Sequence, residues 1–93
     1  MAERLSDHEI SEALQGTDWS REGESIVREV KLDDFRGAVA LVNRVAEAAE
    51  DANHHPDITI HGYNRVRLTL STHSAGGLTG ADLSLARKID ELI

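Results

Sequence analysis

The first repeating pattern of apolar positions lies near the start of the chain and predicts a short helix. Ile10 and Leu14 are spaced so that both face one side of a helix. Ser6 and Glu9 have the spacing of a capping box, in which each side chain accepts a hydrogen bond from the backbone N–H of the other. Gly16 is expected to end this helix in a left-handed conformation.

Alternating apolar and polar residues then predict two antiparallel strands. A short strand begins at Trp19, residues 21–25 contain the turn, and residues 26–32 alternate between an apolar face and a charged face. Arg28 falls on the apolar face of the second strand and therefore conflicts with the simple alternation.

The longest helix is predicted to start after Asp33 or Asp34 and to run to about Asp51. Either aspartate can cap its start, because a carboxylate accepts hydrogen bonds from the free N–H groups of the first turn. The positions expected to face the core recur at three- and four-residue steps, and they are Phe35, Ala38, Val39, Val42, Val45, Ala46 and Ala49. Pro56 excludes helix beyond this point and favours an extended backbone at His55.

A hairpin and a last helix complete the pattern. Residues 58–61 and 66–72 alternate, and residues 62–65 supply turn chemistry between them. Residues 74–77 are expected to form a flexible loop, and Thr79 with Asp82 then has the spacing of a second capping box. The apolar stripe of the last helix consists of Leu85, Ala86, Ile89, Leu92 and Ile93. The elements predict one α+β domain over residues 1–93, with the order αββαββα and a four-stranded antiparallel sheet carrying three helices on one face.

Charge and composition exclude several functional classes. The chain carries 17 acidic against 10 basic residues and no basic cluster, so direct nucleic-acid binding is not expected. It has no cysteine and therefore no disulfide or thiolate metal site. The longest apolar run, residues 38–42, is far shorter than the roughly 20 residues needed to span a bilayer. Because the first residues also lack the apolar stretch of a signal peptide, we expect a cytoplasmic protein without membrane contact.

Three of the five histidines provide the candidate chemistry. The motif His54-His55-Pro56 and the residue His73 flank the predicted hairpin, so antiparallel pairing brings them to the same end of adjacent strands. Imidazole, with an ordinary pKa of about 6.5, can both give and take a proton near neutrality. The cluster therefore indicates either proton-transfer chemistry or a metal site. His8 and His61 are expected to lie on the surface.

At these positions the chain resembles the pterin-4a-carbinolamine dehydratases. The pattern of that family is met by Glu50, His54-His55-Pro56, Tyr63, His73 and Asp82. Residues 63–66 and 69–73 are also similar to the hairpin of the family, and the resemblance extends over nearly the whole chain. It implies an enzyme that recycles a pterin by removing water from a 4a-hydroxytetrahydropterin, giving the quinonoid dihydropterin. The resemblance implies neither a cofactor nor a metal.

The resemblance also implies roles for individual residues. The active-site imidazoles would be His54, His55 and His73, with His55 and His73 as the acid–base pair and His54 orienting the pterin. Glu50 would position an imidazole and favour its protonated form. The other implied site residues are the substrate-binding Asn53, Ser71, Thr72 and Ser74 and the supporting Tyr63 and Asp82. Asn53 and Ser74 stand where the family often has carboxylates.

Two alternatives to this interpretation remain open. The three histidines could ligate zinc together with Glu50 or Asp82, although adjacent residues of an extended backbone point to opposite faces. The second alternative is a non-catalytic role in binding other proteins or assisting their assembly. Leu83 lies beside the stripe of the last helix and favours self-association into a homodimer or homotetramer. The presence of all three imidazoles favours catalysis, because a scaffold would not need them.

Overall fold

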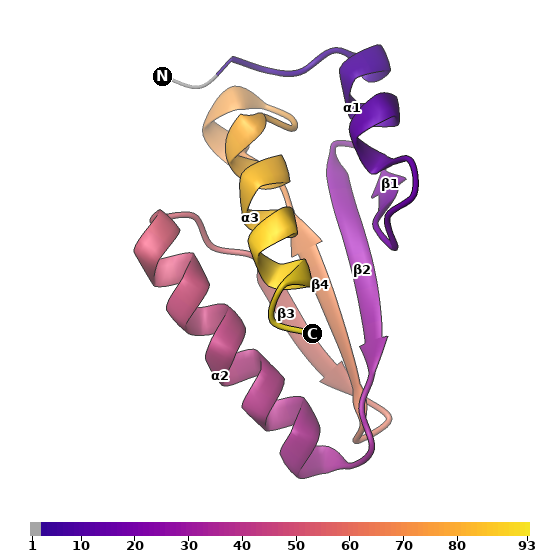
Figure 1. Ribbon diagram of the computed structural model, residues 1–93. Helices are drawn as coiled ribbons and strands as arrows, with labels where there is room; N and C mark the ends of the chain where they lie inside the picture. The colour runs from indigo at the N-terminus through magenta and orange to yellow at the C-terminus, as the bar shows by residue number, and fades with distance from the viewer. Residues whose placement is uncertain (1–2) are drawn as a thin grey trace.

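Four antiparallel strands form a single sheet in the order β1-β2-β4-β3 in the computed structural model, which describes residues 3–93 (Figure 1). The elements are α1 (Asp7–Leu14), β1 (Ser20–Glu22), β2 (Ser25–Lys31), α2 (Phe35–Ala52), β3 (Asp57–His61), β4 (Arg65–Leu70), a 3-10 turn η1 (His73–Ala75) and α3 (Gly80–Asp90). The predicted α+β class and the predicted order of helices and strands are confirmed. The first two residues of the predicted domain lie outside the described residues.

The helices and one face of the sheet enclose the core. α2 and α3 cross that face, and α1 lies beside β1 and β2 (Figure 1). Leu41 from α2, Leu68 from β4 and Ile89 from α3 are all fully buried. Burying an apolar side chain of this size contributes about 1.5–3 kcal/mol, so this layer is a main source of stability. None of the helices within residues 3–93 has the length and the apolar composition needed to cross a membrane.

The buried side of α2 is rotated relative to the predicted stripe. Its buried residues are Ala38, Leu41, Val45, Ala48 and Ala49. Leu41 and Ala48 were not expected to face the core, whereas Phe35 was expected there and is 54% exposed. Phe35 stands in the first turn of α2, at the end of the helix that α3 does not reach (Figure 1). The face of α2 is therefore set by where its neighbours lie rather than by the apolar pattern alone.

Arg28 is accommodated on the apolar side of β2 by carboxylates from other elements. Its guanidinium donates a hydrogen bond to Asp90 of α3, and its Nη2 lies 3.3 Å from Oδ2 of Asp18. The indole N–H of Trp19 donates to the same Asp90 oxygen over 2.9 Å. The Arg28 side chain is only 14% exposed, and pairing makes this burial tolerable. Arg28, the exception to the alternating pattern, thus links β2 to α3.

The start of α1 is built as predicted. The Ser6 hydroxyl accepts a hydrogen bond from the Glu9 N–H over 3.1 Å, and the Glu9 carboxylate accepts one from the Ser6 N–H over 2.9 Å. The hydrogen bond from the Ser6 backbone, followed by that with its side chain, lowers the pKa of Glu9 below its ordinary value. The helix ends at Leu14, and Gly16 follows with a φ of 74°.

The register of the strands decides which loops meet. Asp57 of β3 pairs with Thr69 of β4, and Ile26 of β2 pairs with Leu70 of β4. The chain entering β3, the chain leaving β4 and the turn before β2 therefore lie at the same end of the sheet. The tandem histidines precede β3 and His73 follows β4, so both candidate segments lie at this end.

Candidate functional site

The end of α2 presents His54 and His55. Asn53 terminates the helix with a φ of 50°, a left-handed conformation that asparagine adopts more readily than most residues. The His54 N–H still donates to the carbonyl of Ala49 over 3.1 Å. Pro56 then favours the extended backbone that leads into β3. Asn53 therefore turns the chain at the point where the two imidazoles begin, and its own side chain is exposed.

The segment after β4 forms a hydrogen-bonded turn. The Ala75 N–H donates to the Thr72 carbonyl over 3.0 Å, and the Gly76 N–H donates to the His73 carbonyl over 3.1 Å. The Thr72 N–H closes the turn by donating to the Gly77 carbonyl over 3.1 Å. Gly76 has a φ of 70°, which glycine adopts without steric penalty. Residues 74–77, expected as a flexible loop, thus belong to an internally bonded turn, and β4 ends at Leu70 rather than at residue 72.

Asp82 joins these two segments. Its carboxylate is fully buried in the first turn of α3, and its Oδ1 lies 2.5 Å from Nε2 of His54. Its Oδ2 accepts hydrogen bonds from the Thr72 hydroxyl over 2.7 Å and from the Thr79 N–H over 2.9 Å. The Thr79–Asp82 capping box predicted for the last helix is confirmed. One carboxylate therefore caps α3 and contacts residues from both candidate segments.

The contact with Asp82 determines how the His54 imidazole is oriented. When the Asp82 carboxylate is ionised it can only accept hydrogen bonds, and the proton shared with His54 then lies on Nε2. Because Asp82 is buried, losing one of its donors would leave negative charge without compensation. Nδ1 is then the ring nitrogen of His54 that is left to interact with a ligand.

His55 and Glu50 form a second pair of imidazole and carboxylate, closer to solvent. Nε2 of His55 lies 2.6 Å from Oε2 of Glu50, with the two side chains 58% and 75% exposed. Exposed pairs contribute at most about 1 kcal/mol, so this contact orients the imidazole more than it stabilises the fold. Each tandem histidine thus has its own carboxylate. In the part of the chain that the structure describes, no three His, Cys, Asp or Glu side chains are grouped so that they could hold a metal ion.

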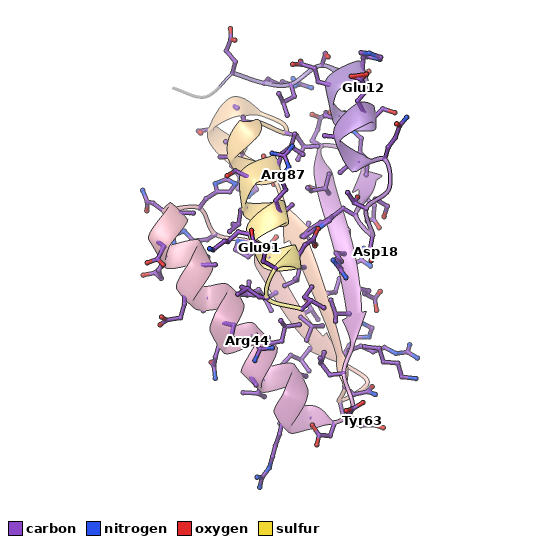
Figure 2. The ribbon with its side chains drawn as sticks, in the orientation of Figure 1. Glu12, Asp18, Arg44, Tyr63, Arg87 and Glu91 are labelled. Carbon is purple, nitrogen blue, oxygen red and sulfur yellow. The ribbon has the colours of Figure 1, made fainter. Side chains whose placement is uncertain are left out.

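His54 and His73 line two separate hollows. His73 is exposed and lines a hollow of about 280 Å³ together with Glu24, Ser25, Ser71, Thr72, Gly76 and Gly77. His54 lines a larger hollow of about 600 Å³ between the end of α2 and α3, where Arg87 and Glu91 project from α3 (Figure 2). Within one chain, His54 and His73 therefore lie at the same end of the sheet but line different hollows. Asp82 and Thr72 form the connection between them.

One of the predicted site residues lies at the other end of the sheet, and another lines the hollow of His73 with its polar groups already bonded within the protein. Tyr63 stands in the hairpin turn with a φ of 56° and is 65% exposed, at the opposite end of β3 and β4 (Figure 2). Within one chain, Tyr63 therefore lies far from the candidate imidazoles of His54, His55 and His73. Thr72 uses its backbone N–H and carbonyl within the turn and its hydroxyl on Asp82. Ser71 and His73 are left as the neighbouring residues with which a ligand can interact.

Sequence reasoning identified Asp82 as a helix cap but not as a partner of His54. The spacing from Thr79 signals the cap, whereas His54 lies 28 residues earlier and no local pattern marks the contact. Glu24 in the hollow of His73 was also missed. A pairing of β2 with β4 in the observed register would have found it, because that register places the β1–β2 turn beside residues 71 and 72.

Comparisons with known proteins give a consistent result. A family model described as "Pterin 4 alpha carbinolamine dehydratase" matches residues 3–92. Provisionally named pterin-4-alpha-carbinolamine dehydratases of Nocardia farcinica and Thermomicrobium roseum are 60% and 56% identical, over 97% and 96% of this chain and 95% and 96% of theirs. A crystal structure from Brucella melitensis, described as a transcriptional coactivator/pterin dehydratase, matches with a TM-score of 0.88 and 38% identity, covering 96% of this chain and 97% of that chain.

A more distant solved structure has a similar architecture. A pterin dehydratase-like protein, described as a RuBisCO assembly factor in the alpha-carboxysome, matches with a TM-score of 0.68 and 21% identity. The match covers 83% of this chain and 90% of that chain. At this level of identity the likeness shows the fold alone.

Proposed function

The chain belongs to the pterin 4 alpha carbinolamine dehydratase family, and we propose that it removes water from a 4a-hydroxytetrahydropterin to give the quinonoid dihydropterin. The observation that carries this proposal is the double contact of Asp82. One buried carboxylate holds His54 and also Thr72, the residue before His73. The histidine segments of the family pattern are thereby anchored to a common group, as an active site assembled from two stretches of chain requires.

The proposed reaction needs two proton transfers. The C4a–O bond breaks as a proton reaches the leaving oxygen, and a double bond forms between C4a and N5 as N5 loses its proton. We assign these transfers to His55 and His73, because both imidazoles are exposed at the same end of the sheet. General acid or base catalysis of this kind typically contributes about 10²–10⁴-fold per group. His54, fixed on Asp82, would orient the ring through Nδ1.

The pterin ring is proposed to lie against residues 71–74. Ser71 and His73 would bind its polar edge, and Asn53 and Ser74 would form the rim. Both rim residues are exposed and uncharged, so recognition there would rest on neutral hydrogen bonds. Glu50 would keep the imidazole of His55 oriented during the transfers.

The proposed activity is tested by following the dehydration of chemically prepared 4a-hydroxytetrahydropterin by absorbance. We expect the protein to accelerate the reaction well above its spontaneous rate and to show saturation with substrate. Circular dichroism on the same sample verifies that the protein is folded. A rate equal to that without protein, from a folded sample, would refute the proposal.

The fold by itself does not decide between catalysis and a role in protein assembly. The RuBisCO assembly factor shares the architecture at an identity that carries no function. The three imidazoles, two of them paired with carboxylates, are what favours catalysis here.

We also propose that the chain forms a homodimer or homotetramer. Phe35 is 54% exposed and Ile93 is 46% exposed, while Leu83 is partly buried against the core. Exposed apolar side chains of this size favour association when they meet a matching surface. Sedimentation velocity at micromolar concentration is expected to give a species of at least twice 10.2 kDa. A single species of monomer mass would contradict this expectation. A cytoplasmic location likewise stays a prediction.

A further inference from the structure

The segment that precedes α1 lies against the turn that carries His73. Arg4 forms an antiparallel bridge with Thr79, and the Leu5 N–H donates to the Leu78 carbonyl over 2.8 Å. This segment runs across the loop before α3 on its way to α1 (Figure 1). Arg4 and Leu5 are thus paired with the two residues that follow the His73 turn.

An ion pair crosses the same turn. The Arg4 guanidinium donates to the Glu24 carboxylate over 2.9 Å, joining residues that are 20 positions apart. A Cβ atom at Gly77 would lie 2.5 Å from Oε2 of Glu24 and 2.7 Å from Nε of Arg4. The ion pair is therefore in close contact with Gly77, and this approach is possible only because glycine has no side chain.

Gly77 connects the ion pair to the turn that carries His73. It is bridged to Thr72 through the hydrogen bond from the Thr72 N–H to the Gly77 carbonyl, and His73 lies inside the turn that this bridge closes. Glu24, Gly77 and His73 also line the same hollow. A shift of the ion pair would consequently move one wall of the hollow and the backbone that carries the imidazole.

We propose that the Arg4–Glu24 ion pair, seated on Gly77, is a positioning device for His73, an inference that rests on the proposed dehydratase function. Arg4 does not line the hollow, so it can act on His73 without touching the substrate. An exposed ion pair adds little to global stability, whereas displacing a reacting group by about 1 Å can lower a rate up to about 10²-fold. Removal of the ion pair should therefore lower kcat much more than it lowers the free energy of unfolding.

Gly77→Ala is the sharpest test, because the added methyl group displaces the ion pair. The atoms it would meet are the end of the Glu24 side chain and Nε and Cδ of the Arg4 side chain, not backbone, and Gly77 does not have a positive φ, so we expect the fold to tolerate the change. Gly80→Ala is the matched control, since a Cβ there would meet nothing within 4 Å. Arg4→Gln removes the ion pair from outside the hollow, and Arg4→Lys restores its charge.

We expect Gly77→Ala and Arg4→Gln to lower kcat about three- to tenfold, within the range that small misplacement of a reacting group produces. For Arg4→Gln the KM should stay near the wild-type value, Arg4→Lys should recover most of the loss, and Gly80→Ala should match the wild type. The NMR resonances of the His73 imidazole should shift in Gly77→Ala and Arg4→Gln but not in Gly80→Ala.

Equal kcat values and equal His73 imidazole spectra for Gly77→Ala and Gly80→Ala would overturn the proposal. A loss of kcat in Arg4→Gln that accompanies a comparable loss of folded protein would overturn it as well. If the wild type proves inactive, the proposed function fails, and the imidazole spectra alone decide whether the ion pair positions His73.

Discussion

Replacing either proposed acid–base histidine by alanine is expected to lower kcat by about 10²-fold or more, because each removes one of the two proton transfers. His73→Ala and His55→Ala should both remain folded. His73 is exposed, and the imidazole of His55 is 58% exposed with one contact to the similarly exposed Glu50. The dehydration assay measures kcat and KM for each variant, with thermal unfolding as the measure of stability.

His61→Ala provides the control for these variants. His61 lies on β3 and pairs with Glu29 over 2.8 Å, away from the segments that carry the candidate site. Its replacement removes an imidazole and its contact with Glu29 but should leave kcat unchanged. The assigned roles are wrong if His73→Ala and His55→Ala retain the turnover of His61→Ala.

Asp82→Ala is expected to produce the largest loss of stability of any single change at the site. The substitution leaves His54, the Thr72 hydroxyl and the Thr79 N–H without their common acceptor in a position that is 0% exposed. A buried donor left without its acceptor costs about 1–3 kcal/mol, so the loss of this shared acceptor is expected to cost about 3–5 kcal/mol in total. Urea unfolding at neutral pH measures the free energy of unfolding, and activity should fall together with the orientation of His54.

Asp34→Ala is the matched control for the capping part of this effect. Asp34 caps α2 by accepting one hydrogen bond from the Gly37 N–H over 2.7 Å, and it contacts no imidazole. Losing such a cap costs about 1 kcal/mol. If Asp82→Ala and Asp34→Ala destabilise the protein equally, the contacts of Asp82 with His54 and Thr72 contribute nothing.

Asp82→Asn separates the orientation of His54 from the stability of the fold. The amide keeps the size of the side chain and one acceptor oxygen, but its NH₂ group cannot accept a hydrogen bond. The variant should fold with a smaller loss of stability than Asp82→Ala. It should still lower kcat, because the His54 imidazole then loses its fixed tautomer and orientation.

The elements that could be predicted from the sequence are those whose causes are local. The capping boxes at Ser6 and Thr79 and the strands around Ile26 and Val66 follow from spacing within a few residues. The buried face of α2 was predicted less accurately. Phe35 is exposed because no neighbouring element packs over it, and the apolar pattern of α2 carries no information about where its neighbours lie.

The contacts that organise the site are long-range, and this is why the sequence did not reveal them. His54 meets Asp82 across 28 residues, and Arg4 meets Glu24 across 20. Such contacts depend on strand register and on the packing of α3 against α2, neither of which a local motif encodes. The tandem imidazoles and His73 were found because the hairpin between them is a local feature. The contacts of Asp82 with His54 and Thr72 depend on long-range packing and were not found.

The proposed active site requires one pterin to reach imidazoles from both segments, although His54 and His73 line separate hollows within one chain. This requirement is tested most directly by titrating ¹⁵N-histidine-labelled protein with a stable dihydropterin and following the five imidazole spectra by NMR. We expect the resonances of His54, His55 and His73 to shift together with one apparent Kd, while those of His8 and His61 stay unchanged. Shifts confined to one segment, or different Kd values for His54 and His73, would contradict it.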